Sequence, residues 1–394
     1  MKDIVVQKYG GATLSDAERI KAVARRIVAT KERGYNVVVV VSAMGKTTDS
    51  LLAQAKSITE NPGRRELDML LSVGERITMS LLSMAIQNLG HEAISFTGSQ
   101  SGIMTSDSHI NARIIDVRPV RIVDELERDR IVIVAGYQGM SYKREITTLG
   151  RNGSDTTAVA LASALQARWC EICKEVEGVF SADPEKVPEA KLLKKISYRE
   201  MEVMSEGGAA VLTPEAIEFA RSRGLEVRLT SAFGKGEGTL VLAEREPEST
   251  IHAVTSQKNI HFLEMNYKSS EELQDFLSAL EKLKLPASAL HFEGPNQGRL
   301  ECILDAKDLH EWQADSRCLC DSCPDLSVRE DLCTVSVIGT RIGEDAASLK
   351  RAALLLSENN IDWKLVLTLR HRFTFLVPKD SEELALKILH DAVC

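Results

Sequence analysis

The first 235 residues alternate between short apolar stretches and helix-forming stretches, and this order restricts the fold more than any other feature. Strands are predicted near residues 3–7, 37–41, 92–96, 131–135, 168–173 and 225–230, with helices between them. Strands and helices in this alternation predict a doubly wound α/β sheet, whose ligands bind beyond the carboxyl ends of the strands. We therefore expect the functional residues to follow the strands.

The first predicted strand leads into a glycine-rich loop, Lys8-Tyr9-Gly10-Gly11-Ala12-Thr13. Glycines let backbone N–H groups come close to a ligand, and Lys8 supplies a positive charge. The next residues, Ser15 to Glu18, have capping-box spacing and predict the start of a helix. Strand, glycine loop and helix in this order predict a phosphate-binding site.

A polar turn at residues 148–158 precedes a helix-forming run that we expect from Ala158 to Ala167. The start of a helix presents unpaired N–H groups and the positive end of the helix dipole, so it favours anions. Arg151 adds a guanidinium suited to a carboxylate, and Asp155 adds a carboxylate with no obvious structural role. A helix that is only N-capped needs a single Ser or Asp, so the turn predicts a ligand site.

Five motifs occur in an order that resembles the aspartate kinases of the amino-acid kinase superfamily. They are Lys-Tyr-Gly-Gly-Ala-Thr-Leu at 8–14, Val-Val-Ser-Ala-Met at 40–44, Ser-Val-Gly-Glu at 72–75, Gly-Tyr-Gln-Gly at 136–139 and Gly-Arg-Asn-Gly-Ser-Asp at 150–155. The similarity runs to about residue 235 and continues more faintly to the C-terminus. It implies an enzyme that uses ATP with Mg²⁺ to phosphorylate the side-chain carboxylate of L-aspartate or a close analogue.

The resemblance and the chemistry together assign the candidate site. The catalytic candidates are Lys8 and Asp155, the substrate-binding ones are Ser42, Glu75, Arg151 and Ser154, and the nucleotide-binding ones are Gly10, Gly11, Lys174, Glu175 and Asp183. No residue is assigned as a metal ligand. A substrate carboxylate is already a nucleophile, so Asp155 is interpreted as an orienting acceptor or a charge near the substrate rather than as a strong base. The alternative for Glu75 is a residue on the helix surface, paired with Arg76.

Several positions depart from the family pattern, mostly on the nucleotide side. Ala12 replaces a substrate-binding Thr, and residues 174–178 read Lys-Glu-Val-Glu-Gly where the family usually has Thr-Asp-Val-Asp-Gly. Glu185 and Ala210 stand where the family has Arg and Lys, so two phosphate-side cations are absent. A single lost donor can cost roughly 10²–10³ in rate.

Three consequences of these departures remain open. Either Lys174 supplies part of the missing positive charge, or nucleotide use has changed, or catalysis has weakened. The simplest alternative for Lys174 itself is a solvated surface lysine without a role in the site. The corresponding alternative functions are a catalytically silent relative that acts as an amino-acid sensor or scaffold, and a kinase of another acidic amino acid in a specialised pathway.

Beyond about residue 250 the pattern changes to two stretches that each predict a strand, an amphipathic helix and further strands. These stretches resemble the paired ACT modules of aspartate kinases. We expect a catalytic domain at 1–240, a first ACT-like module at 251–325 and a second at 326–394, with the C-terminal region pairing subunits into a homodimer. The first module lacks a Pro-Gly turn, so inhibition by common end products is expected to be weak or absent; an appendage used only for dimerisation is the alternative.

Composition limits the partners. The net charge of −8 and the lack of a Lys/Arg block argue against non-specific nucleic-acid binding. Met1 leads directly into a predicted core strand, and no apolar run approaches the roughly 18 residues of a spanning helix, so a cytoplasmic protein without a membrane partner is expected. The eight cysteines are expected to be reduced. Cys318, Cys320 and Cys323 are interpreted as loop residues without metal, because the paired Cys-x-x-Cys spacing of zinc sites is missing.

Overall fold

The structure is a computed structural model that describes the chain except residues 1, 151, 210, 235, 244–252, 286, 307, 308, 310 and 311. The chain forms two compact units. The first, here called the N-terminal unit, comprises Met1–Phe180, Lys191–Glu206 and Ala210–Ser249. The second, the C-terminal unit, comprises Ser181–Ala190, Gly207–Ala209 and Thr250–Cys394.

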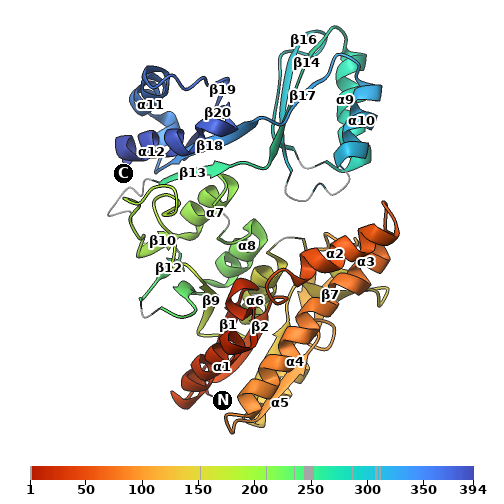
Figure 1. Ribbon diagram of the computed structural model, residues 1–394, viewed down its shortest axis with the longest axis vertical. Coiled ribbons are helices and arrows are strands. Elements are labelled where there is room, and N and C mark those ends of the chain that lie inside the picture. Colours follow the sequence, from red (N-terminus) through yellow and green to blue (C-terminus); the bar gives the residue numbers. More distant parts are fainter. Residues whose placement is uncertain are drawn as a thin grey trace. The chain divides into compact units, whose positions relative to one another are not determined.

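The N-terminal unit is built on an eight-stranded sheet (Figure 1). In sheet order its strands are β10 (Lys195–Ser197), β12 (Thr239–Leu242), β11 (Val227–Ser231), β9 (Trp169–Lys174), β1 (Ile4–Tyr9), β2 (Asn36–Val41), β6 (Ile131–Ala135) and β3 (Ala93–Phe96). Every neighbouring pair is parallel except β11 and β12. The central strands are covered on both faces, and this is why β2 is apolar at five consecutive positions and fully buried.

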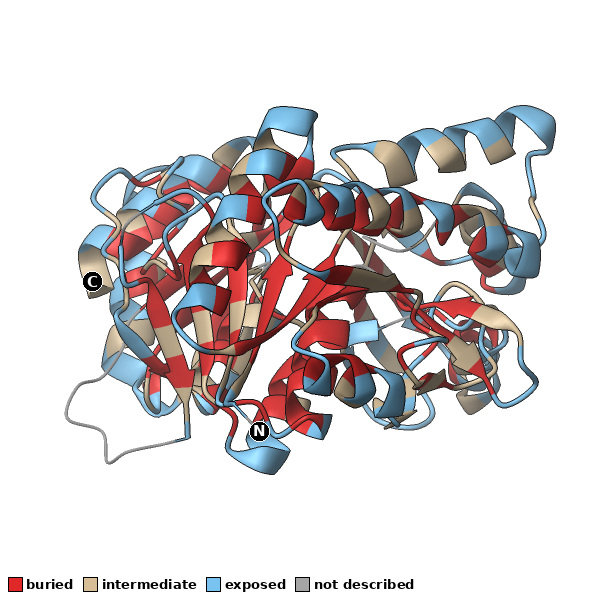
Figure 2. Cartoon of the chain, turned by 90° about the horizontal axis from the view of Figure 1, so that it is seen from below, coloured by how far each residue is buried: buried red, intermediate tan, exposed pale blue. Residues whose placement is uncertain are grey.

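Helices cover both faces of this sheet. They are α1 (Ala17–Glu32), α2 (Thr47–Ile58), α3 (Arg64–Leu71), α4 (Val73–Gln87), α5 (Val120–Glu127), α6 (Gly153–Ala164), α7 (Tyr198–Glu206) and α8 (Pro214–Arg223), with the short turn η1 (Ala12–Leu14). Helices α1 and α4 share one core cluster with alternate residues of β1, β2 and β6. Helix α6 packs on β1, β2 and β9. Figure 2 shows the buried residues gathered on the strands and on the inward faces of the helices. The doubly wound sheet predicted from the sequence is confirmed.

A second, small sheet of the N-terminal unit was not predicted. Its order is β5 (Ile114–Val117), β4 (Ile103–Thr105), β7 (Gln138–Ser141) and β8 (Ile146–Thr148). Each strand has three or four residues, too few for a periodic pattern to be recognised. The sheet matters for the site because β8 ends at Thr148, the first residue of the polar turn.

One helical segment corrects the expectation that no stretch is long and apolar enough to span a membrane. Among the described residues, Arg64–Gln87, which comprises α3 and α4, meets that test by length and composition. Half of its most apolar window is buried inside the protein. Leu82 and Ile86 of this segment lie in the core cluster under the sheet. The segment therefore has the environment of a core helix.

The C-terminal unit contains two four-stranded antiparallel sheets. The first has the order β15 (Ala287–Phe292), β16 (Gly298–Asp305), β14 (Ile260–Tyr267) and β17 (Ser327–Arg329), with the helices α9 (Ser270–Leu283) and α10 (Trp312–Ser322). The second has the order β13 (Ala253–Gln257), β18 (Leu332–Ile338), β20 (Arg372–Pro378) and β19 (Leu365–Leu369), with α11 (Ala346–Glu358), α12 (Glu382–Val393) and the turns η2 (Ile342–Glu344) and η3 (Lys379–Ser381). Two α+β modules were predicted, and this arrangement agrees.

The two sheets do not follow the boundary expected between residues 325 and 326. Strand β13, from the first stretch, pairs with β18 of the second sheet, and β17, from the second stretch, pairs with β14 of the first. Helix α10 gives a further correction, because it contains Cys318 and Cys320, which were expected in a loop. Positions two apart on a helix project about 200° from each other, so these two thiols point in different directions.

The C-terminal unit also includes residues 181–190, which follow β9 in the chain. The backbone N–H of Val254 donates to the carbonyl of Ser181 at 2.7 Å. Val187 is fully buried in the core of the second sheet. Nζ of Lys186 lies 2.9 Å from Oε1 of Glu382, at the start of α12. The chain therefore leaves the N-terminal unit at this point and returns to it at Lys191.

Candidate active site

The candidate site is centred on an ion pair between the end of β1 and the first turn of α6. Nζ of Lys8 lies 2.5 Å from Oδ1 of Asp155, and the two residues are 6% and 1% exposed. Helix α6 begins at Gly153, five residues before its predicted start at Ala158. Ser154 and Asp155 therefore belong to the helix, which corrects the sequence prediction.

The first turn of α6 lacks the simple cap that was considered as an alternative. The residue before the helix, Asn152, has left-handed backbone geometry (φ 57°) and makes no side-chain cap hydrogen bond. The whole segment from Gly153 to Ser163 is buried. A buried helix start without a side-chain cap retains the positive potential of its N–H groups, and this favours an anion.

A second lysine flanks the same carboxylate. Nζ of Lys174, the last residue of β9, lies 3.5 Å from Oδ2 of Asp155 and donates to the carbonyl of Val211 at 2.6 Å. Burial raises the pKa of Asp155, but the charges of Lys8 and Lys174 outweigh it and hold the pKa below its usual value. Two ammonium groups around one carboxylate leave a net positive charge at the ends of β1 and β9. The alternative of a solvated surface lysine does not fit Lys174, whose side chain is only 23% exposed.

Glu75 is a buried carboxylate in the first turn of α4, so the alternative of a surface residue paired with Arg76 is also ruled out. It is 3% exposed, and its Oε1 accepts a hydrogen bond from the backbone N–H of Ala43 at 3.0 Å. Its buried Oε2 has no hydrogen-bond partner among the described residues. Burial raises the pKa of Glu75 to about 7. An unpartnered carboxylate oxygen in such a place suits an ammonium group of a ligand.

The glycine loop packs tightly against the loop that follows β2. A Cβ atom on Gly11 would lie 2.6 Å from the carbonyl oxygen of Ala43, so only glycine allows the two loops this close. Ser42 is half-buried in the second loop, and its N–H donates to the carbonyl of Tyr9 at 3.1 Å. Gly10 adjoins Lys8, since a Cβ there would lie 3.8 Å from its Nζ.

Ser154 is placed beside the end of β6. A Cβ atom on Gly136, the residue after that strand, would lie 2.8 Å from the Oγ of Ser154. The structure therefore brings catalytic, substrate-binding and nucleotide-binding candidates to the carboxyl ends of four parallel strands, β1, β2, β6 and β9. The residues so placed are Lys8, Gly10, Gly11, Ser42, Glu75, Ser154, Asp155 and Lys174.

The comparisons with known proteins agree with this geometry. A family model described as "Amino acid kinase family" matches residues 3–231. The chain is 37% identical to an aspartokinase of Corynebacterium glutamicum, with 98% of this chain and 95% of the relative covered. It is also 37% identical to aspartokinase 2 of Bacillus subtilis, covering 99% of this chain and 97% of the relative. The chain belongs to the aspartokinase family.

Solved aspartokinase structures share the fold of this family member along its whole length. Aspartokinase III of E. coli, crystallised with aspartate and ADP, aligns with a TM-score of 0.83 at 22% identity and covers 99% of both chains. The aspartate kinase of Clostridium acetobutylicum aligns with a TM-score of 0.72 at 20% identity, covering 99% of this chain and 100% of its own. These likenesses confirm the predicted fold, an amino-acid kinase domain followed by paired ACT-like modules.

Two predicted residues of this aspartokinase-family chain make their observed contacts with residues other than those of the strand-end cluster, and a third is not described. Glu175 is exposed, and its Oε1 lies 2.5 Å from Nη1 of Arg19, which also donates to the carbonyl of Ala12. Asp183 is exposed in the C-terminal unit, where its Oδ1 accepts from the N–H of Glu185. Arg151 lies outside the described residues. Their assigned roles remain predictions.

The side chains present fit a phosphate group better than a metal held by the protein alone. Within the described ranges, no three His, Cys, Asp or Glu side chains are grouped so as to hold a metal ion. Asp155 already faces two ammonium groups. Mg²⁺ commonly binds through one or two carboxylates together with substrate phosphates, so any such ion would come with the nucleotide.

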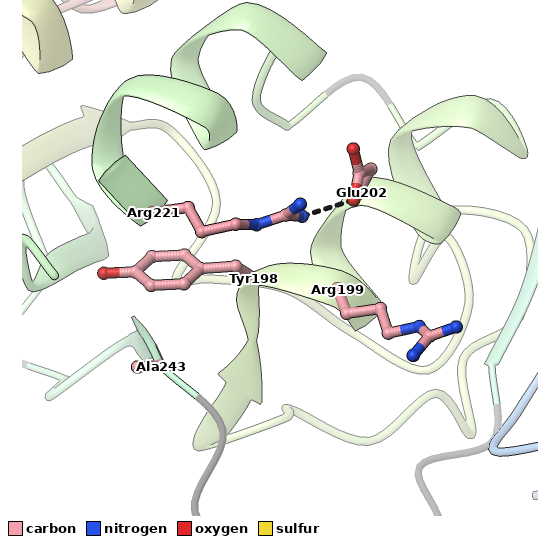
Figure 3. A pocket seen from close by; sticks show the side chains of 5 residues that line it. All are labelled: Tyr198, Arg199, Glu202, Arg221 and Ala243. Carbon is pink, nitrogen blue, oxygen red and sulfur yellow. Dashed lines mark hydrogen bonds and ion pairs between the residues drawn. The ribbon is translucent and has the colours of Figure 1, made fainter. Parts of the chain in front are cut away.

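A cavity elsewhere in the N-terminal unit shares no residue with this cluster. It has a volume of about 540 Å³ and is lined by Tyr198, Arg199, Glu202, Arg221 and Ala243. Figure 3 shows Arg221 paired with Glu202 in its wall. We assign the site to the strand ends, because the buried charges gather there.

Sequence reasoning missed a buried carboxylate next to this site. Asp68 of α3 is 0% exposed and bonds to Thr148, the first residue of the polar turn. It also contacts His109 and Ile110 in the loop between β4 and β5. No local pattern marks this set, because its members come from three separate parts of the chain.

Proposed function

We propose that this protein transfers the γ-phosphoryl group of ATP to the side-chain carboxylate of L-aspartate and so forms an acyl phosphate. The observation that carries the proposal is the net positive cluster of Lys8, Asp155 and Lys174 beside the unpartnered oxygen of Glu75. It occurs in a chain that is 37% identical to aspartokinases over nearly its full length. Phosphoryl transfer needs this combination of positioning and charge neutralisation.

Each residue has a role that its surroundings support. Lys8 and Lys174 stabilise the charge that spreads over the phosphoryl oxygens, with the N–H groups of Gly10 and Gly11 beside them. Asp155 orients both ammonium groups, and its lowered pKa makes it a poor proton acceptor near neutral pH. No base is required, because the acceptor carboxylate is itself the nucleophile.

The acceptor half is proposed to recognise the two charged ends of an amino acid. The free oxygen of Glu75 accepts from the α-ammonium group, while Ser42 and Ser154 offer hydroxyl groups. Arg151, outside the described residues, keeps its predicted role as the ligand of a carboxylate. Two family cations are replaced, at Glu185 and Ala210. We propose that Lys174 supplies part of that missing charge.

The domain assignment and the assembly belong to the same proposal. We assign catalysis to residues 1–240 apart from the segments 181–190 and 207–209, which belong to the C-terminal unit. We assign ACT-like modules to 251–325 and 326–394, with β13 and β17 exchanged between their sheets, in a cytoplasmic homodimer formed through the C-terminal region. The edge strand β15 supports this pairing, because Leu290 and Phe292 are 40% and 44% exposed on it. An exposed apolar edge strand favours pairing with another chain.

A coupled ADP-release assay with a panel of acidic amino acids and several nucleotides tests the function. L-Aspartate with ATP should give the highest kcat/KM. If another acidic amino acid is preferred, the acceptor assignment is wrong. Binding of aspartate without any turnover would instead favour the catalytically silent alternative.

Variants of the central ion pair separate catalysis from stability. Lys8→Ala and Asp155→Ala should each abolish turnover. Asp155→Ala should destabilise the fold by about 3–5 kcal/mol, because the buried ammonium groups of Lys8 and Lys174 lose their carboxylate. Lys8→Ala should cost less, because Asp155 keeps Lys174 as its partner. The double variant Lys8→Met/Asp155→Leu removes both charges of the central pair at similar volume, so it should be more stable than Asp155→Ala without recovering activity. Turnover near the wild-type rate in any of these folded variants contradicts the assigned roles.

A further inference from the structure

Asp68 is the centre of a hydrogen-bond network that the proposed reaction does not use. Its Oδ1 accepts from the hydroxyl of Thr148 at 2.5 Å and from the N–H of Ile110 at 3.0 Å. Its Oδ2 lies 2.6 Å from Nδ1 of His109. Burial raises the pKa of Asp68, and these hydrogen bonds oppose that effect. A buried carboxylate with this many donors fixes the segments that supply them.

The network joins helix α3 to the loop between β4 and β5, residues 106–113. Within this loop Ile110 has a φ of +72°, which is rare for a β-branched residue. Such backbone strain persists only where the surroundings hold it, and here the N–H of Ile110 is held by Asp68. The loop is therefore kept in one strained conformation by a side chain from another element.

The same loop lies against the turn of the acceptor half of the site. The N–H of Ala112 donates to the carbonyl of Thr148 at 3.0 Å. A Cβ atom on Gly150 would lie 2.6 Å from Oδ1 of Asn111, so the loop leaves no space above that glycine. Thr148 is thus held through its hydroxyl by Asp68 and through its carbonyl by the loop. The polar turn continues from Thr148, and its sequence includes Arg151.

We propose that Asp68 is a positioning residue for the acceptor amino acid: through Thr148 and the loop 106–113 it fixes the start of the turn at Leu149 and Gly150, on which acceptor binding depends. This inference rests on the proposed function, in which that turn binds the acceptor carboxylate. The phosphate-side groups, Lys8 with the glycine loop and Lys174, are carried by β1 and β9. Loosening the turn therefore acts on the acceptor and leaves nucleotide binding in place.

A matched set of threonine variants tests this. Thr148→Val keeps the shape and removes the hydroxyl, whereas Thr148→Ser restores it. Thr147→Val is the control, because its buried hydroxyl contacts Thr105 at 2.5 Å and not Asp68. We expect Thr148→Val to raise the KM for aspartate at least tenfold while the KM for ATP stays within twofold. Thr148→Ser and Thr147→Val should remain within threefold of the wild type for both substrates.

Two outcomes overturn the inference: an unchanged KM for aspartate in Thr148→Val, or an equal rise in Thr148→Val and Thr147→Val. If Thr148→Val does not fold, His109→Gln takes its place, since that side chain is 22% exposed and its loss is better tolerated. It should raise the KM for aspartate several-fold, and an unchanged value counts against the inference.

Measurements on the wild-type protein distinguish a failure of this inference from a failure of the proposed function. If the wild type shows no turnover with aspartate and ATP, the proposed function is wrong. The dissociation constant of aspartate, measured by calorimetry in the same variants, then decides the inference on its own, with the same tenfold criterion. Equal affinity of wild type and Thr148→Val, or no binding of aspartate to the wild type, rejects it.

Discussion

Replacing Lys174 by Met tests how this chain neutralises the phosphates of its nucleotide. Methionine keeps the length of the side chain and removes the ammonium group that lies 2.6 Å from the Val211 carbonyl and 3.5 Å from Asp155. A hydrogen bond to a charged group contributes about 1.5–3 kcal/mol. Nucleotide affinity should therefore fall about 10- to 150-fold. Asp155 keeps Lys8 as its partner, so the variant should stay folded.

Calorimetry with ADP and with a non-hydrolysable ATP analogue measures the effect directly. Lys56→Met is the control, since Lys56 is an exposed lysine on α2 of the same unit. The KM for aspartate should change less than twofold in both variants. If Lys174→Met binds nucleotide within twofold of the wild type, the reasoning is refuted, and Lys174 only ties β9 to the segment around Val211.

The pH dependence of this affinity adds a second check. Burial lowers the pKa of Lys174, and the neighbouring Asp155 opposes that effect. The ammonium group is charged below this lowered pKa and loses its charge as the pH rises through it. Nucleotide affinity in the wild type should therefore begin to fall below the usual lysine value of about 10.5. Lys174→Met should lack this step, and an identical pH profile in the two proteins contradicts the assignment.

Three further predictions concern the acceptor, the assembly and regulation. The pKa of Glu75 is raised from 4.5 to about 7, so the folded state holds the extra proton and stability falls as the pH rises through this range, by up to about 3 kcal/mol. In Glu75→Gln the free energy of unfolding, measured by urea titration, should no longer differ between pH 5 and pH 7.5 for this reason. In the wild type the KM for aspartate should fall as Glu75 ionises, and Glu75→Gln should lack this fall. Phe292→Lys on the edge strand β15 should convert a dimer into monomers in sedimentation velocity; a dimer of unchanged affinity places the interface elsewhere. Lysine, threonine or methionine at millimolar concentration should inhibit less than tenfold, and stronger inhibition that changes in residues 251–394 relieve contradicts the expected weak regulation.

The central sheet could be predicted from the sequence because its strands are buried on both faces. A strand such as Asn36–Val41 must then be apolar at nearly every position, and short runs of this kind between helical stretches are easily recognised. Strands of the small sheet, such as Ile103–Thr105, are too short to show a period. The start of α6 was misplaced for another reason. Ser154 and Asp155 have low helix propensity, yet tertiary packing places both in a buried helix.

The candidate site was predictable to the extent that it follows strand ends. Lys8 and Lys174 end or nearly end parallel strands, and parallel strands bring such residues to one edge of the sheet. The contact of Asp68 with His109 had no such signal. The two residues are 41 positions apart in the chain, and the contact exists only after α3 and the loop 106–113 have packed.

The excursion of residues 181–190 into the C-terminal unit limits how this protein can be divided. A fragment that ends at residue 249 would carry Val187, which is fully buried, without the sheet that covers it. It would also carry Lys186 without Glu382. The two units therefore cannot be exchanged between relatives as blocks joined at one position. A functional chimera has to take residues 181–190 and 207–209 from the same parent as its C-terminal unit, so recombination near residue 250 alone is expected to yield proteins with a mismatched core.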